Sequence, residues 1–149
     1  MKRFVLDFFS KKAPVTSVTV DCIAAKYAKS GLTFQEAAEI KQKINLALKQ
    51  DRIYKNNAIG LNDLSSHIDK DRYKVSQVLN EYLSRNFYSL INQYRIEEAK
   101  DLLLTQPFLS VKAIMYEVGF NSKTSFYSAF KKETGLSPND YRLLTSFAS

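Results

Sequence analysis

The sequence predicts an all-α protein, and three observations lead to this fold class. Only 4 of the 149 residues are glycine and 3 are proline, which favours long helices and few tight turns. From Phe34 onward, apolar residues recur at spacings of three and four, the period of an amphipathic helix. The segment 15–20 is rich in β-favouring residues, but no partner strand occurs elsewhere, so we expect a leader or linker there.

The composition bounds the class of protein. A hydrophobic fraction of 45% excludes wholesale disorder, and the single cysteine, Cys22, excludes an intramolecular disulfide. No apolar run approaches the ~18–20 residues needed to cross a bilayer. The chain begins like a signal peptide, but Asp7 interrupts the apolar stretch and no small-residue cleavage site follows. We therefore expect one domain in the cytoplasm, where thiols stay reduced.

The positive charge is distributed unevenly along the chain. The formal net charge is +7, with 22 basic and 15 acidic residues. Residues 1–60 hold 11 basic and 5 acidic residues, a net +6, whereas residues 61–149 hold 11 and 10, a net +1. Such an excess suits nucleic acid, an anionic membrane surface or solubility alone, and composition does not choose among them.

The expected helices can be justified in chain order. The first runs from Phe34 to about Tyr54, with Thr33 and Glu36 as a capping box at its start. The next four are short or medium amphipathic stretches separated by turn residues. We expect these at about 61–68, 75–83, 88–104 and 111–118. Ser122 is a good N-cap for a further helix that ends at Gly135, and Ser137-Pro138 opens the last one.

Part of this pattern occurs twice, about 50 residues apart. The corresponding apolar pairs are Leu64/Ile68 with Ile114/Val118, and Val75/Leu79 with Phe126/Phe130. Each copy is a short amphipathic helix, a tight turn and a second amphipathic helix, the pattern of a helix-turn-helix, whose second helix lies in the major groove. Gly119 suits the second turn because glycine adopts left-handed backbone conformations readily, whereas Asp69-Lys70 occupies the first turn.

The outward faces of the two second helices are rich in amide, hydroxyl and aromatic groups, whereas a solvated helix face carries mostly Glu and Lys. Amides can bond to adenine edges, and hydroxyls to bases or phosphates. The first face carries Tyr73, Gln77, Asn80 and Ser84, with Ser76 and Glu81 beside them. The second carries Thr124, Ser128 and Lys131, with Tyr127 and Lys132 beside them. On these residues alone, DNA reading and an ordinary bundle surface remain equal alternatives.

A long ordered motif runs through the second half of the chain. It reads Arg95-Ile96-x-x-Ala99-x-x-Leu102-Leu103, then Ile114-x-x-x-Val118-Gly119-Phe120, then Ser125-Phe126-x-x-x-Phe130-Lys131-Lys132-x-x-Gly135-x-Ser137-Pro138-x-x-Tyr141-Arg142. With this motif, residues 61–144 resemble the DNA-binding domain of AraC/XylS-type transcription regulators. The resemblance implies a seven-helix domain with two homeodomain-like helix-turn-helix units joined by a long linker helix. It also implies sequence-specific binding to double-stranded DNA, with both second helices in successive major-groove segments.

The resemblance also assigns roles to individual residues. The family's base-facing positions fall on Tyr73, Ser76 and Gln77 in the first unit and on Lys123, Thr124, Ser125 and Ser128 in the second. The helical wheel adds Asn80, and Lys131 and Lys132 are expected to contact phosphates. Phe120, Phe126 and Phe130 are expected in the core, and Arg95 and Arg142 are expected to orient helices through buried polar contacts. One departure is that Ser84-Arg85-Asn86 stands where relatives commonly end the first unit's second helix with glycine.

The domain organisation follows from these assignments. We expect a leader at 1–33 and an AraC-type DNA-binding domain at 34–149, with helix-turn-helix units at about 61–84 and 110–134 and a linker helix at about 88–104. Four further stretches resemble a subgroup, the Bacteroidetes-type regulators, in which this module hangs from a membrane sensor: Lys26-Tyr27-Ala28-Lys29-Ser30-Gly31-Leu32, Val78-Leu79-Asn80-Glu81, Asn86-Phe87 and Ile91-Asn92-x-Tyr94-Arg95. Lys2, Arg3, Lys11 and Lys12 then form a basic stretch on the inner face of the membrane.

Other chemistry finds little support in the sequence. The only histidine, His67, and the only cysteine lie in different segments, so we expect neither a nucleophile pair nor a metal site. Glu97 and Glu98 are adjacent and point in different directions, so they form no acid/base pair. We expect no enzyme and no cofactor. The expected partners are double-stranded DNA, RNA polymerase and a membrane sensor region outside this chain. The alternative function is a helical interaction or adaptor module without direct DNA readout.

Overall fold

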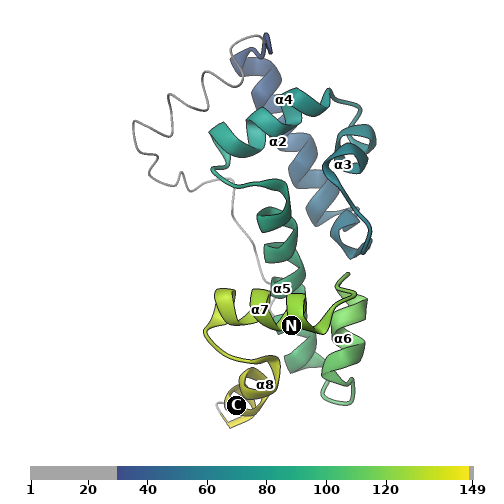
Figure 1. Ribbon diagram of the computed structural model, residues 1–149, viewed down its shortest axis with the longest axis vertical. Coiled ribbons are helices and arrows are strands. Elements are labelled where there is room, and N and C mark those ends of the chain that lie inside the picture. The colour runs from purple at the N-terminus through teal and green to yellow at the C-terminus, as the bar shows by residue number, and fades with distance from the viewer. Residues whose placement is uncertain (1–29, 148–149) are drawn as a thin grey trace. The chain divides into compact units, whose positions relative to one another are not determined.

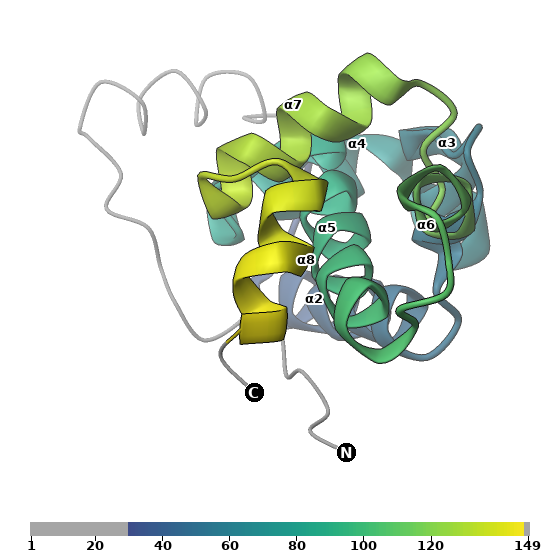
Figure 2. The same cartoon turned by 90° about the horizontal axis from the view of Figure 1, so that it is seen from below.

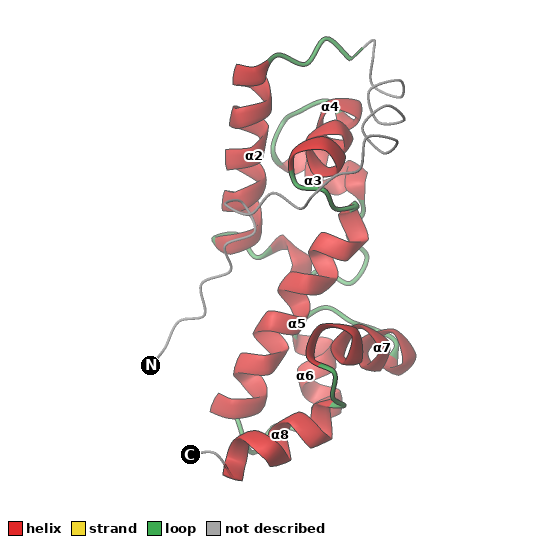
Figure 3. Cartoon of the chain, turned by 90° about the vertical axis from the view of Figure 1, so that its left-hand side faces the viewer, coloured by secondary structure: helices red, strands yellow, loops and turns green. Residues whose placement is uncertain are grey.

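The computed structural model describes residues 30–147, and every regular element among them is helical (Figure 1; Figure 3). The elements are α2 (Phe34–Lys49), a 3₁₀ turn η1 (Ile53–Lys55), α3 (Leu61–His67), α4 (Arg72–Gln77), a π-helical turn η2 (Val78–Tyr82), α5 (Phe87–Thr105), α6 (Val111–Glu117), α7 (Lys123–Thr134) and α8 (Pro138–Phe147). Within this described range, the predicted all-α fold with seven α-helices is confirmed. Most of the leader predicted at 1–33, including its basic residues and Cys22, falls on residues 1–29 and lies outside this range.

The described residues form two compact units. The N-terminal unit consists of residues 30–53 and 59–90, and the C-terminal unit consists of residues 54–58 and 91–147. α5 therefore contributes its first turn to the N-terminal unit and the rest of its length to the C-terminal unit. Across residues 30–147, no helix combines the length and the apolar character needed to cross a membrane.

In the N-terminal unit, α2 lies alongside the helix pair α3 and α4 (Figure 3). The predicted apolar stripe of α2 is confirmed, because Ile40, Ile44 and Leu48 are completely buried. The two other helices contribute Leu64, Val75 and the first residues of η2 to the same core. Fully burying a side chain of this size contributes about 1.5–3 kcal/mol, so this stripe is the main attachment of α2 to the unit.

The first helix is shorter than predicted, because it ends at Lys49 rather than near Tyr54. Arg52 has a φ of 50°, a backbone conformation outside the α-helix. The next helical residues form only the separate 3₁₀ turn η1. The predicted capping box is formed on one side only. Thr33 Oγ1 accepts a hydrogen bond from the amide of Glu36 at 3.1 Å, but the Glu36 carboxylate binds Lys74 instead of the backbone of Thr33.

In the C-terminal unit, α6, α7 and α8 surround the C-terminal part of α5 (Figure 2). The core contains Ile96, Ala99, Leu103, Ile114, Met115, Val118, Phe120, Phe126 and Phe130, so the three phenylalanines are core residues as predicted. Tyr141 of α8 packs edge-on against Phe130, with ring centroids 5.4 Å apart. Arg142 donates from Nε to the carbonyl oxygen of Leu103 and from Nη2 to that of Gln106, both at 3.3 Å, which ties α8 to the end of α5.

The predicted internal repeat is present in the backbone as well as in the apolar pattern. Both helix-turn-helix turns begin with two amide-to-carbonyl hydrogen bonds at equivalent places. These are Asp69–Ser66 and Lys70–Ser65 in the first turn and Gly119–Tyr116 and Phe120–Met115 in the second, all between 3.0 and 3.2 Å. Asp69 and Gly119 both have positive φ angles, 53° and 105°. The same turn is therefore built once with an aspartate and once with a glycine.

The second helices of the two units end differently. α7 ends at Gly135, whose φ of 78° is the left-handed conformation that usually closes a helix. In the N-terminal unit, α4 widens into the π-helical turn η2, and Ser84 takes the left-handed position with a φ of 52°. The glycine that the sequence lacks is thus replaced by a serine in the same kind of backbone conformation.

Candidate nucleic-acid interface

The second helix of the C-terminal unit, α7, presents a polar arc to solvent. Ser122 caps the helix, since its side chain accepts a hydrogen bond from the amide of Ser125 at 3.3 Å. Phe126 and Phe130 are completely buried, and this fixes which side of the helix faces outward. The exposed residues include all six of the predicted site residues on this helix: Lys123, Thr124, Ser125, Ser128, Lys131 and Lys132.

The lysines of this arc are not neutralised within the protein. Among residues 30–147, neither Lys131 nor Lys132 forms an ion pair with a carboxylate, and Lys123 has none either. The Nζ of Lys123 lies 5.3 Å from the ring centroid of Tyr127, a cation–π distance that places the charge over the first turns of α7. These cations are therefore available to phosphate groups.

The turn in front of α7 can be built only with glycine. A Cβ on Gly119 would lie 2.5 Å from the carbonyl oxygen of Tyr54 and 2.9 Å from Nε of Arg95. Arg95 is buried and donates from Nε to the Tyr54 carbonyl at 2.7 Å and from Nη2 to the Asn56 carbonyl at 2.9 Å. Burial lowers the pKa of this guanidinium, which nevertheless remains charged. Arg95 thus makes the buried polar contacts that were predicted for it, and they join α5 to the segment around Tyr54 and Asn56.

The segment 54–58, which we call the strap, is held against α5 and α6. The hydroxyl of Tyr54 donates to Glu98 at 2.6 Å, and the Nζ of Lys55 lies 3.0 Å from carboxylate oxygens of both Glu98 and Glu117. Burial acts to lower the pKa of Lys55, but its hydrogen bonds with the two carboxylates outweigh burial and raise it. The strap thus supports the turn that positions α7, a role that the local sequence pattern did not reveal.

The corresponding face of the N-terminal unit is more enclosed. Asp71 caps α4 by accepting hydrogen bonds from the amides of Tyr73 and Lys74 at 3.0 and 3.2 Å. Tyr73 is 69% exposed, but the three other predicted site residues, Ser76, Gln77 and Asn80, are half-buried. The Asn80 amide donates to the carbonyl oxygen of Ser76 at 3.0 Å. The structure therefore groups these four residues on one helix face, with less of that face open to solvent.

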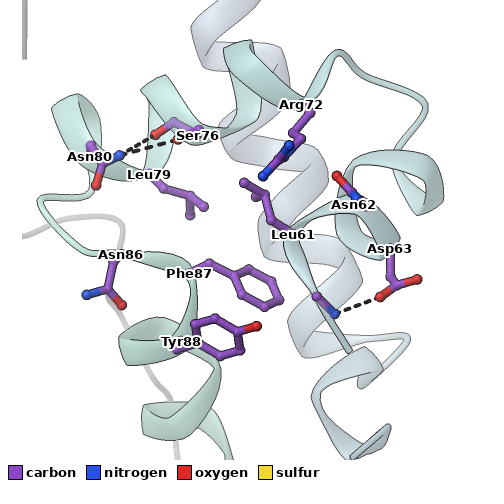
Figure 4. Close-up of a pocket in the computed structure, with 11 residues that line it drawn as sticks. Leu61, Asn62, Asp63, Arg72, Ser76, Leu79, Asn80, Asn86, Phe87 and Tyr88 are labelled. Carbon is purple, nitrogen blue, oxygen red and sulfur yellow. Dashed lines mark hydrogen bonds between the residues drawn. The ribbon is translucent and has the colours of Figure 1, made fainter. Parts of the chain in front are cut away.

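A hollow of about 640 Å³ lies beside α4 in this unit (Figure 4). Its walls come from the first turn of α3, from α4 and η2, and from the first turn of α5. Ser76 and Asn80 line it together with Arg72, which is exposed and forms no ion pair among the described residues. Arg72 is a further candidate for DNA contact. Its place directly after the capping Asp71, in the first turn of α4, is the signal that could have identified it.

Lys74 of α4 and Lys70 of the preceding turn both form ion pairs with acidic residues of α2. The Nζ of Lys74 lies 2.8 and 2.9 Å from the two carboxylate oxygens of Glu36, and Lys70 lies 2.9 Å from Glu39. The hydrogen bond and charge of Lys70 lower the pKa of Glu39, and the hydrogen bond from Glu39 raises the pKa of Lys70. The two carboxylates therefore compete with any external anion for these lysines.

Three further titratable residues, His67, Glu97 and Glu98, have structural partners. His67 is partly exposed, and its Nε2 lies 2.7 Å from a carboxylate oxygen of Asp51. Glu97 binds Lys100 at 2.9 Å, whereas Glu98 faces the strap, so the two adjacent glutamates do point to different partners. No cluster of three or more metal-ligating side chains occurs in the part of the chain that the structure describes.

These features define a protein with two helix-turn-helix units, each with a polar second helix. A family model described as a helix-turn-helix domain matches residues 64–143. The chain belongs to the AraC-type family of helix-turn-helix transcription regulators, and the resemblance read from its motifs is confirmed.

Individual relatives show how much of the chain the likeness covers. The chain is 32% identical over 128 residues to a protein from Pseudoalteromonas carrageenovora named as an uncharacterized HTH-type transcriptional regulator, covering 76% of this chain and 74% of that one. It is 31% identical over 85 residues to the xylose operon regulatory protein of Haemophilus influenzae, covering 57% of this chain and 22% of that one. The chain thus spans about a fifth of the length of that regulator.

A solved structure shows that the fold is shared as well. A transcriptional regulator from Chromobacterium violaceum, described as an AraC-type DNA-binding domain-containing protein, superposes with a TM-score of 0.59 at 20% identity. The superposition covers 69% of this chain and 91% of that one.

Proposed function

We propose that the chain acts as a sequence-specific regulator that binds double-stranded DNA and inserts α4 and α7 into successive major-groove segments. The second helix of a helix-turn-helix unit enters the major groove, and half-sites one DNA turn apart are separated by about 34 Å. α5, the helix that joins the two units in sequence, has 19 residues and is therefore about 28 Å long. A linker helix of this length is compatible with two units that bind half-sites about one DNA turn apart.

The observation that carries the proposal is the exposed polar arc of α7. Thr124 and Ser128 supply hydroxyl groups that can bond to bases, and Lys123 at the start of the helix suits a guanine edge or a phosphate. Lys131 and Lys132 suit phosphates. Tyr73, Ser76, Gln77, Asn80 and Arg72 are the corresponding contacts in the N-terminal unit.

The first experiment selects bound duplexes from a random library and measures binding to the enriched sequences. Changing Lys123, Thr124 and Ser128 together to Ala is expected to weaken binding to the selected duplex about 100-fold at ~100 mM salt, because each lost base contact costs about 1–3 kcal/mol. A matched control changes Lys49, Gln35 and Gln42 to Ala. These three residues are exposed on α2 and lie outside the proposed interface, and their loss removes the same charge. The control protein should bind as the wild type does.

The selection also separates the two classes of function. A DNA reader gives an enriched sequence and a binding constant that falls with salt as counterions are released. If the folded wild-type protein enriched no sequence, the regulator proposal would fail and the adaptor alternative, a helical module without DNA readout, would be favoured. Circular dichroism of every variant checks that the helices are intact.

The cellular setting forms part of the same proposal. We place the chain in the cytoplasm with DNA as its partner, acting by binding rather than by catalysis, and with RNA polymerase and a membrane sensor region as further partners. Its longer relative, of which it spans about a fifth, supports a role as one module of a larger protein. Transcription by purified RNA polymerase from a promoter that carries the selected duplex tests the polymerase contact. Fractionation of cells tests the membrane tether.

A further inference from the structure

The start of the described chain holds one flank of α4. The Ser30 hydroxyl donates a hydrogen bond to Oε1 of Gln77. Both carboxylate oxygens of Glu36 accept hydrogen bonds from the Nζ of Lys74. Ser30 and Glu36 lie on either side of Thr33, the N-cap of α2. We call these two contacts, Ser30 with Gln77 and Glu36 with Lys74, the latch.

The latch occupies groups that a DNA reader needs. Lys74 and Gln77 are three positions apart and so lie on one flank of the helix. The amide nitrogen of Gln77 donates to Glu81 at 2.9 Å while its oxygen accepts from Ser30, so both polar atoms of this side chain are engaged. A glutamine reads adenine by using its donor and its acceptor at once. In the latched protein neither atom of Gln77 is available for that pairing.

The electrostatic part of the latch has the same consequence. Glu36 supplies a bidentate carboxylate where a DNA phosphate would otherwise bind Lys74. The side chains of Glu36 and Lys74 are only 27% and 26% exposed, so the pair is partly shielded from solvent. Lys70 and Glu39 repeat the arrangement one helical turn further along α2. The lysines of this turn and helix are therefore already neutralised before DNA arrives.

We propose that the latch competes with DNA for α4 and so limits the affinity of the N-terminal unit, which makes Ser30 and Glu36 affinity-limiting residues. This competition rests on the proposed function, and it regulates how tightly the N-terminal unit binds DNA. It requires that the two contacts open when α4 binds DNA. Anything that draws the segment around Ser30 away from α4 would then strengthen binding through this unit.

The experiment compares binding to the selected duplex by the wild-type chain, by Glu36→Gln and by Ser30→Ala combined with Glu36→Gln. Release of Lys74 to a phosphate is expected to steepen the dependence of log K on log salt by about 0.9 and to tighten binding about fivefold at ~100 mM salt. Asp51→Asn is the matched control, because it removes one acidic charge from the same unit at a site paired with His67. It should leave the salt slope unchanged.

A double-mutant cycle identifies the lysine. Lys74→Gln alone is expected to change binding by less than about twofold, whereas Lys74→Gln combined with Glu36→Gln should remove the gain. Thermal unfolding of each variant confirms that the fold survives.

Three results would overturn the latch: unchanged or weaker binding by the Glu36 variants, a gain that persists without Lys74, or a gain of the same size in the Asp51 control. These results leave the proposed function intact, since wild-type binding is measured beside them. A wild-type chain that selects no duplex overturns both proposals.

Discussion

The turns of the two helix-turn-helix units share their hydrogen bonds but differ in the residue at the left-handed position. The C-terminal unit has Gly119 there, pressed against the carbonyl oxygen of Tyr54 and the side chain of Arg95. The N-terminal unit has Asp69 there, and the side chain of this residue is exposed. Glycine is therefore required in one copy by a close approach of the backbone, and not by the turn itself.

The two units also differ in the state of their cations. Lys70 and Lys74 of the N-terminal unit are bound to Glu39 and Glu36 of α2. Lys131 and Lys132 of the C-terminal unit have no carboxylate partner among residues 30–147. The two copies of the motif therefore differ in how many unpaired cations they present. The C-terminal unit is the stronger candidate for the larger share of the phosphate contacts.

The largest expected effect comes from Gly119→Ala. A methyl group would meet the Tyr54 carbonyl at 2.5 Å, and alanine is strained at a φ of 105°, so the strap or the turn must shift. We expect the free energy of unfolding to fall by about 2–4 kcal/mol, measured by urea denaturation.

Gly135→Ala is the matched control for this first prediction. Gly135 also has a positive φ, but nothing lies within 4 Å of its would-be Cβ, so only the backbone strain of about 1 kcal/mol is expected. Equal losses at the two glycines would mean that the strap does not press on the turn.

The second prediction removes two cations from each unit in turn. Lys131→Gln with Lys132→Gln is expected to weaken binding to the selected duplex at least tenfold and to reduce the salt slope by about 2. Lys70→Gln with Lys74→Gln removes the same charge but should cost much less, because those lysines are already neutralised. Fluorescence anisotropy titrations between about 50 and 200 mM salt measure both. Equal losses of affinity in the two double variants would mean that both pairs of lysines contribute equally to DNA binding, against this prediction.

Much of the helical framework could be predicted from the sequence, because a helix reveals its buried face through the spacing of nearby apolar residues. Leu64 and Val75 in one copy and Ile114 and Phe126 in the other are all completely buried, as the repeat indicates. The end of α2 was predicted wrongly. The apolar spacing continues towards Tyr54, whereas the backbone turns at Arg52 through a positive φ that no local preference signals.

The environment of the site residues could not be predicted in the same way. Glu36 and Lys74 are 38 positions apart, and Tyr54 and Glu98 are 44 apart. Helical periodicity indicates which face of a helix is covered but not which helix covers it. The exposed arc of α7 follows from its own sequence, whereas the partial burial of Gln77 depends on where the segment around Ser30 packs.

The smallest expected effect is at the aspartate that stands in place of Gly119. Asp69 holds a φ of 53°, a conformation that costs a non-glycine residue about 1–2 kcal/mol, and glycine would remove that strain. The greater freedom of glycine in the unfolded chain offsets about 0.5–1 kcal/mol of this gain. Asp69→Gly is therefore expected to raise the free energy of unfolding by about 0.5 kcal/mol in urea denaturation. Asp69→Asn, which keeps a side chain that tolerates this conformation, separates the backbone effect from the loss of charge beside Lys70. A loss of stability in the glycine variant but not in the asparagine variant would show that the side chain at this position, rather than its backbone, holds the first turn together.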